Sequence, residues 1–231
     1  MVVNPNTTAS MTAAVVAGAR AVAGPGTEVV GATPSRGVAS VESHVDELWG
    51  AVGVLEAVLN GERTGVDGYV IACFGDTGLL GAREAATGPV VGMTEAALYT
   101  AAMIAHRFSI ITMPLRTMEQ AERVVRAVGL GHRCTVRAVD EPVAGVHRGS
   151  THLLELFTSE GRETMQRDAA EAVILGCAGL NDLVDPLQEA LGVPVVDGVL
   201  AAVTMVEGLL AQGLSTSRTS TFAPPERLGP T

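Results

Sequence analysis

Residues 67–75 read DGYVIACFG and residues 171–179 read EAVILGCAG, and these two stretches decide the fold. Each has an acidic residue before a short apolar run, then a small residue, a cysteine, and a glycine two positions after the cysteine. Short apolar runs bounded by glycine are typical of strands buried on both faces of a parallel sheet. The sequence therefore predicts two equivalent strands, each of which ends at a thiol, Cys73 in one and Cys177 in the other.

The likeness extends along the chain at a nearly constant spacing. The two cysteines are 104 residues apart. Three further matches pair residues 89–92 with 194–197 at a spacing of 105, and residues 2–4 with 110–112 and 27–30 with 135–138 at a spacing of 108. Parallel strands resemble one another in general, but four matches in order at a nearly constant spacing favour a duplication. We therefore expect two similar halves of about four strands each.

Composition agrees with an α/β protein whose strands are parallel. Apolar residues make up 47% of the 231 residues and aromatic residues only 3%, so the cores must consist mainly of Ala, Val, Leu and Ile. Apolar runs alternate with helical stretches from end to end. Strands are expected near residues 1–4, 27–32, 68–72, 89–92, 107–112, 135–139, 172–176 and 194–197. Helices are expected near 8–23, 42–60, 77–87, 94–105, 116–128, 151–168, 181–191 and 199–212, with an irregular tail over 215–231.

Charge and cysteine usage exclude several classes of protein. A net charge of −10 with 15 basic residues argues against binding nucleic acid. The sequence shows no secretory leader and no apolar run long enough for a membrane helix, so we expect a cytoplasmic protein that does not bind membranes. Three cysteines without close pairs favour free thiols, and the five histidines show no metal-ligand spacing. Because no P-loop or dinucleotide fingerprint is present either, we expect neither a metal nor a nucleotide cofactor.

The two thiols are expected to share one site. Ligands of open parallel sheets bind beyond the carboxyl ends of the strands, and both cysteines occupy that position. Two thiols on opposite faces of one carbon can remove and return a proton, which racemises that carbon. A free thiol has a pKa of about 8.5, so the acting base needs help; we expect the following helix amino termini to favour the thiolate, and the N–H groups near Gly75 and Gly179 to hold a substrate carbonyl.

Three motifs in order carry a resemblance to a known family. Residues 4–8 read NPNTT, residues 72–76 read ACFGD and residues 175–179 read LGCAG. Together they resemble the hydantoin/allantoin racemase branch of the aspartate/glutamate racemase superfamily over nearly the whole chain. The resemblance implies two pseudo-symmetric lobes, each a roughly four-stranded parallel sheet flanked by helices, with the active site in the cleft between them. The expected lobes are residues 1–98 plus 204–231, and 99–203.

The resemblance also implies the chemistry and its residues. The reaction would be a cofactor-independent racemisation of a small molecule, a 5-substituted hydantoin or allantoin, by proton exchange at C5. Cys73 and Cys177 would be the two bases. The substrate-binding residues would be Asn4, Phe74, Gly75, Thr112, Ala178 and Gly179.

Other interpretations remain open for several residues and for the function. Asn4 before Pro5 also suits a turn, and Thr112 also suits a strand end. Asp76 is interpreted as a helix cap and Cys134 as structural. The same fold could serve an amino-acid racemase, a maleate isomerase, an arylmalonate decarboxylase, or a non-catalytic protein that clamps a ligand between two lobes. Small residues on the helix surfaces favour a homo-oligomer.

Overall fold

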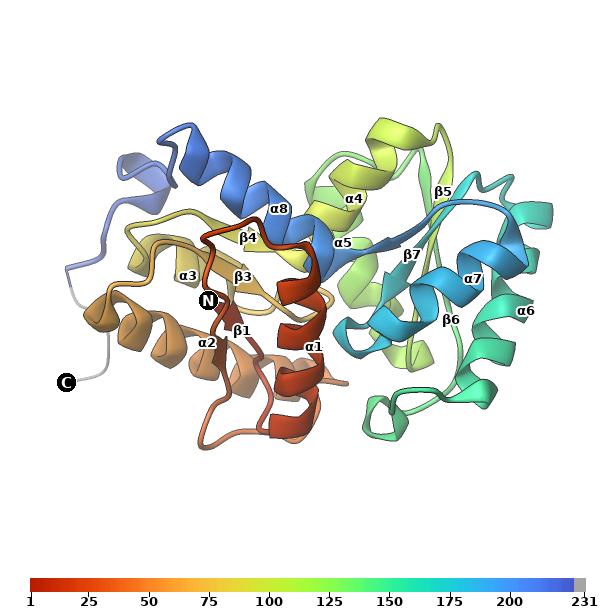
Figure 1. Ribbon diagram of the computed structural model, residues 1–231, viewed down its shortest axis with the longest axis horizontal. Helices are drawn as coiled ribbons and strands as arrows, with labels where there is room; N and C mark the ends of the chain where they lie inside the picture. Colours follow the sequence, from red (N-terminus) through yellow and green to blue (C-terminus); the bar gives the residue numbers. More distant parts are fainter. Residues whose placement is uncertain (227–231) are drawn as a thin grey trace.

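The computed structural model describes residues 1–226 and contains two four-stranded parallel sheets (Figure 1). The first has the strand order β2-β1-β3-β4 and the second β6-β5-β7-β8. The strands are β1 (Val2–Val3), β2 (Gly31–Ala32), β3 (Tyr69–Ile71), β4 (Val90–Gly92), β5 (Phe108–Thr112), β6 (Cys134–Ala138), β7 (Ala172–Gly176) and β8 (Val195–Asp197). The predicted fold class, with two sheets of four parallel strands, is confirmed.

The two sheets have the same topology, and corresponding residues are paired in each. In the first sheet Val3 of β1 lies opposite Ile71 of β3, and in the second Ile111 of β5 lies opposite Leu175 of β7. Each sheet therefore has its first strand in the middle, beside the strand that leads to a cysteine. The strand β2 is shorter than expected, because only Gly31 and Ala32 pair with the two residues of β1.

The eight helices lie near the expected positions, with differences at their ends. They are α1 (Ala9–Val22), α2 (His44–Thr64), α3 (Leu79–Ala85), α4 (Met93–Ile104), α5 (Met118–Ala127), α6 (Thr151–Arg167), α7 (Val184–Leu191) and α8 (Gly198–Ala211). A 3₁₀ turn, Leu115–Thr117, precedes α5, and a longer one, Ala178–Leu183, precedes α7. The segment after each cysteine is therefore not a regular helix at its start.

Helices α4 and α8 each cross to the opposite lobe, and Figure 1 shows them meeting at the centre of the molecule. Although α4 follows β4 of the first sheet, it packs against β7 and β8 of the second; α8 follows β8 and packs against β3 and β4 of the first. Val199 and Val203 of α8 belong to the core of the first sheet. The expected lobe boundaries stay a prediction, and we propose that the second one lies at the start of α8 rather than at residue 203.

The two crossing helices touch at their first residues. A Cβ added to Gly198, the first residue of α8, would lie 2.3 Å from the carbonyl oxygen of Met93, the first residue of α4. Real Cβ atoms do not approach a backbone oxygen so closely, so only glycine allows the two helices to meet at this distance.

The tail after α8 is mostly irregular and follows the first lobe. Arg218 donates hydrogen bonds to the carbonyl groups of Arg83, Glu84 and Ala86 at the end of α3. These carbonyls have no partner inside the helix, so the guanidinium closes the helix end. A short 3₁₀ turn, Ser220–Phe222, follows. The expected irregular structure of 227–231 lies outside the described residues.

Helix α2 carries an apolar stripe on its surface. Val45, Leu48, Trp49 and Val52 of α2 are exposed at helical spacing and form an apolar stripe. The expected homo-oligomer stays a prediction.

Within residues 1–226 no helix has the length and apolar character that crossing a bilayer requires. In the same residues no group of three or more His, Cys, Asp or Glu side chains is arranged to hold a metal ion.

Candidate active site

Cys73 and Cys177 line one cavity between the two lobes. Cys73 lies two residues beyond β3, and Cys177 directly follows β7, so both thiols lie at carboxyl ends of parallel strands. The wall also includes Thr112 at the end of β5, and Met11 of α1. Among the described residues that line the cavity, none carries a charged side chain. The site therefore offers two thiols and neutral groups to a ligand.

The cavity is small, and we call this arrangement of the lobes the closed form. Its volume is about 40 Å³, well below the roughly 300–1,000 Å³ typical of ligand pockets. Two contacts join the lobes beside it: Glu47 of α2 forms an ion pair with Arg123 of α5, and Glu42 accepts a hydrogen bond of 3.0 Å from the backbone N–H of Val143. A ring-sized ligand therefore requires the lobes to move apart before it can enter.

Burial controls the thiol of Cys73. The hydroxyl of Thr77 donates a hydrogen bond of 3.4 Å to its sulfur, which favours the thiolate. Loss of water around the sulfur is the larger effect, and it raises the pKa of Cys73 to about 12. Nearby Cys177 is a further cause that raises the pKa of Cys73. Cys73 is therefore a neutral thiol at pH 7 in the closed cavity.

Cys177 has a similar environment. Burial raises its pKa to about 11, and the nearby backbone N–H of Gly179 offsets only part of that rise. Asp197 and Glu42 add to the increase. The expectation that helix termini lower these pKa values is therefore wrong for the closed form. The physical reason is that a 3₁₀ turn follows Cys177 and α3 begins only at Leu79, so neither sulfur meets a regular helix end that could outweigh burial.

These environments predict how thiol reactivity depends on pH. Because the closed form stays protonated up to about pH 11, we expect alkylation of Cys73 and Cys177 by iodoacetamide to rise about tenfold per pH unit beyond pH 9. The same pH dependence is expected if the reagent enters only when the lobes open. The reactive thiolate then forms from the protonated closed form by opening and loss of one proton, so its amount still rises about tenfold per pH unit. Peptide mass spectrometry measures the two rates, and glutathione, whose thiol is not buried, should level off near pH 9. Levelling of both cysteines below pH 8.5 would contradict the raised pKa values.

Asp76 anchors the Cys73 loop to the start of α4, the helix that packs against the second sheet. Its carboxylate accepts hydrogen bonds from the N–H groups of Thr94 (2.8 Å) and Glu95 (3.0 Å) at the start of α4. A Cβ on Gly92 would lie 2.3 Å from the Asp76 carboxyl carbon, so the carboxylate occupies the space that only a glycine leaves free. Asp76 has a φ of 53°, a strained value for a residue with a side chain. It is a helix cap as predicted, but of α4 rather than of the helix that follows it.

Asp197 occupies the corresponding place in the second lobe. It ends β8, 105 residues after Gly92, and its Oδ1 accepts hydrogen bonds from the N–H groups of Val199 (2.7 Å) and Leu200 (3.1 Å) at the start of α8. Both crossing helices are therefore capped by a buried aspartate, one from the loop after Cys73 and one from the end of β8. Burial raises the pKa of Asp76 to about 7 and raises that of Asp197 as well.

The remaining predicted binding residues divide into two groups. Phe74, Thr112 and Ala178 line the cavity together with the cysteines. Asn4, Gly75 and Gly179 are not among the residues that line it.

Those three residues act behind the cavity wall. The Asn4 amide donates hydrogen bonds to the side chains of Asn6 and Thr12, and Asn6 itself lines the cavity. The Gly75 N–H donates to the Thr94 hydroxyl at 2.8 Å, so it is not free to hold a carbonyl in the closed form. The Gly179 N–H lies near the Cys177 sulfur and lowers the pKa of that thiol. Their direct contact with substrate stays a prediction.

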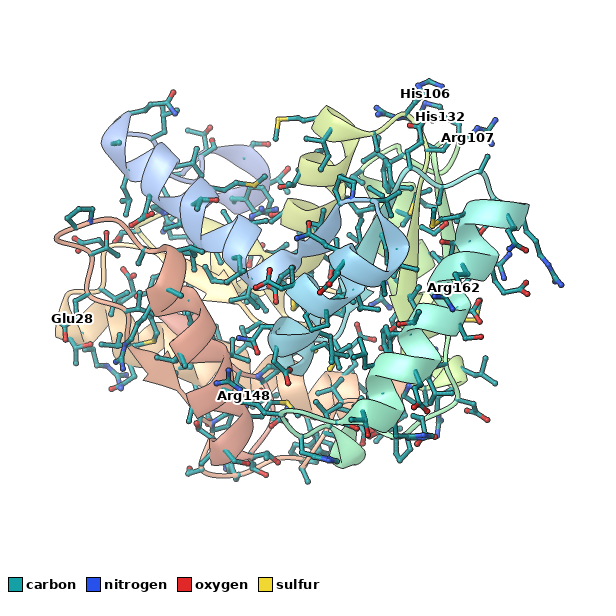
Figure 2. The ribbon with its side chains drawn as sticks, turned by 45° about the vertical axis from the view of Figure 1, so that its right-hand side comes forward. Glu28, His106, Arg107, His132, Arg148 and Arg162 are labelled. Carbon is teal, nitrogen blue, oxygen red and sulfur yellow. The ribbon has the colours of Figure 1, made fainter. Side chains whose placement is uncertain are left out.

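Sequence reasoning missed several residues of the wall. These include Asn6, Met11, Val41, Met113, Thr117, Gln120 and Val143. A signal existed for Asn6, which lies inside the NPNTT motif, and for Thr117 and Gln120, which begin the helical segment after the strand that ends at Thr112. Val41 and Val143 come from loops, whose positions the strand pattern does not indicate. Figure 2 shows His106, Arg107 and His132 together where β5 and β6 begin, the opposite end of the second sheet from the cavity.

Comparison with known proteins identifies the family of this chain. A family model described as Asp/Glu/Hydantoin racemase matches residues 1–206. The chain is 44% identical over 224 residues to a hydantoin racemase of Rhizobium meliloti, covering 96% of this chain and 93% of the relative. It is 40% identical over 227 residues to a hydantoin racemase of Pseudomonas sp. (strain NS671), covering 98% and 91%.

A solved structure supports the same relationship. The allantoin racemase from Klebsiella pneumoniae is 46% identical and superposes with a TM-score of 0.94, covering 98% of this chain and 93% of that one. Identity at this level over almost the full length of both chains extends beyond a shared fold to a shared family. The resemblance inferred from the three motifs is thereby confirmed. The chain belongs to the Asp/Glu/hydantoin racemase family and is a racemase.

Proposed function

We propose that this racemase inverts C5 of a cyclic ureide, a 5-substituted hydantoin or allantoin, by proton exchange between Cys73 and Cys177. The observation that carries the proposal is that both thiols, from corresponding ends of two like sheets, line one small cavity without charged side chains. A two-base reaction needs two equivalent groups on opposite sides of one carbon, and the repeated topology is suited to supply them.

The proton balance of the reaction follows from the two thiols. One cysteine acts as a thiolate and takes the C5 proton, and the electron pair of the broken C–H bond moves into the adjacent carbonyl as an enolate. The other cysteine, a neutral thiol, gives its proton to the opposite face of C5. The first cysteine ends as a thiol and the second as a thiolate, so the enzyme is then set for the opposite enantiomer. The pair must therefore hold one proton between its two sulfurs at the start of each turnover.

The neutral wall favours a neutral ring over a charged amino acid. A free glutamate carries two carboxylates, which need cationic or strongly donating partners when they leave water. A ureide ring is uncharged and needs only hydrogen bonds. The relatives named above, a hydantoin racemase and an allantoin racemase, agree with a ring substrate. An arylmalonate decarboxylase needs only one cysteine, so the paired thiols disfavour that alternative too.

The proposal predicts a specific substrate profile. In D₂O, single enantiomers of 5-benzylhydantoin and of allantoin should lose optical rotation and gain deuterium at C5 when the protein is added. L-Glutamate and L-aspartate should keep both their rotation and their α-proton. Polarimetry and proton NMR measure the two quantities, after subtraction of the spontaneous ureide reaction. The ring-substrate proposal would be overturned if the protein racemised glutamate while the ureides reacted only at their spontaneous rate.

A further inference from the structure

Gln120 occupies an unusual position in the cavity wall. It lies in the first turn of α5, it is only 3% exposed, and it lines the cavity with both cysteines. Its Cβ lies 3.2 Å from where a Cβ on Gly75 would be, so the side chain begins against the Cys73 loop of the opposite lobe. An amide is therefore held at the point where the two lobes meet around the thiols.

The Gln120 side chain differs from the other polar side chains of the wall. Within residues 1–226 its side chain forms no hydrogen bond, whereas the other polar side chains of the wall do. Asn6 accepts from Asn4, and Thr112 and Thr117 bond to each other. Buried polar groups are almost always hydrogen-bonded, because an unpaired one costs free energy. Asn181 Oδ1 is the only fully buried side-chain polar atom without a partner within residues 1–226, so the Gln120 amide keeps some exposure in the cavity that it lines and is available to a ligand.

The chemistry of a carboxamide selects the ligand group. A glutamine side chain offers one acceptor oxygen and two donor hydrogens on adjacent atoms. The ring of a hydantoin presents N–H beside C=O, which is the complementary pair. We propose that Gln120 binds this N–H and C=O edge of the ureide ring with two hydrogen bonds and thereby orients C5 between the thiols; this rests on the function proposed above.

The repeat shows that this role belongs to one lobe only. Thr12 lies 108 residues before Gln120, at the corresponding place in the first half. Its hydroxyl is already bonded to Asn4 and to Thr33, and Thr12 is not part of the wall. Instead Met11, an apolar residue, lines the cavity from α1. The two thiols are equivalent, as a reaction that runs in both directions requires. The residues around them differ between the lobes, as a substrate with one polar edge and one substituent requires.

The experiment compares Gln120→Leu and Gln120→Glu with the wild type and with Gln166→Leu, an exposed glutamine of α6, as the matched control. Gln120→Leu loses both hydrogen bonds, and Gln120→Glu replaces the donor to the ring carbonyl by a repelling carboxylate oxygen. Each change should lower kcat/KM for 5-benzylhydantoin by about 10- to 100-fold, mostly through KM. The control should stay within twofold of the wild type. Thermal unfolding and the rate of Cys73 alkylation without ligand report whether the Gln120 variants are folded.

A substrate methylated on a ring nitrogen provides the readout that a merely structural role would not move. In the wild type, methylation of the ring N–H that binds Gln120 should reduce kcat/KM about as much as Gln120→Leu does. In Gln120→Leu the same methyl group should have little further effect, because the hydrogen bond is already lost. The proposal would be overturned if ring methylation lowered kcat/KM in Gln120→Leu as much as it does in the wild type. It would also be overturned if kcat/KM of Gln120→Leu stayed within twofold of the wild type.

Ligand protection separates the failure of this inference from the failure of the proposed function. Excess 5-benzylhydantoin should slow alkylation of Cys73 and Cys177 in the wild type and should protect Gln120→Leu less. A wild type that neither turns over nor is protected by any ureide would overturn both proposals. A wild type that is active and protected, with an equally protected Gln120→Leu variant, would overturn only the role of Gln120.

Discussion

Serine in place of Cys73 or of Cys177 is expected to slow racemisation of a ureide by about 10³-fold, the contribution typical of a positioned acid or base. A serine hydroxyl is far less acidic than a thiol, so it neither ionises near neutral pH nor gives up its proton readily. The remaining cysteine still faces C5 from one side. We therefore expect each variant to exchange the C5 proton of one enantiomer with deuterium, without inversion, and the two variants to act on opposite enantiomers.

Cys134 supplies the control for this experiment. It begins β6 and does not line the cavity, so Cys134→Ser should racemise at the wild-type rate. Chiral chromatography measures inversion, and NMR in D₂O measures exchange. Two cysteine variants that retain wild-type turnover, or that exchange both enantiomers equally, would contradict the two-base mechanism.

Gly198→Ala is expected to be strongly destabilising. The new methyl group would lie 2.3 Å from the Met93 carbonyl oxygen, and a backbone atom at a helix start has little room to move. Overpacking of this kind should lower the free energy of unfolding by about 3 kcal/mol or more. It should also lower activity, because the starts of α4 and α8 are bound to Asp76 and Asp197 beside the cavity.

Gly208→Ala is the matched control in the same helix. No atom lies within 4 Å of a Cβ at Gly208. Alanine there should raise the free energy of unfolding by about 0.5–1 kcal/mol, the usual gain for replacing glycine inside a helix. Urea denaturation compares the two variants with the wild type. If Gly198→Ala is as stable as Gly208→Ala, the close contact between α4 and α8 is absent in solution.

Much of the fold could be predicted because it depends on patterns within short segments. An apolar run between glycines indicates a buried strand wherever it occurs, and the near-constant spacing of four such runs indicated the doubled sheet. The crossing of α4 and α8 depends on contacts between residues about 100 positions apart. Nothing in the local sequence of Met93 or Gly198 indicates which sheet the helix will cover.

The site was predictable to a similar extent and for the same reason. Cys73, Phe74, Thr112, Cys177 and Ala178 follow strands directly, so their place at the strand ends could be inferred. The pKa directions could not, because a local rule about helix termini carries no information on how completely the lobes exclude water from a sulfur. The partner of Asp76 could not be predicted either, because it comes from a different helix.

The exchange of α4 and α8 between lobes means that neither half of the chain contains a whole core of its own. Each sheet relies on a helix that grows out of the other, which is the arrangement of a domain-swapped homodimer whose two copies have been joined end to end. In such an arrangement the axis that relates the two thiols is built into the connectivity of the chain. A single polypeptide can then change the two halves separately, and residues such as Gln120 and Met11 can diverge while the cysteines stay paired.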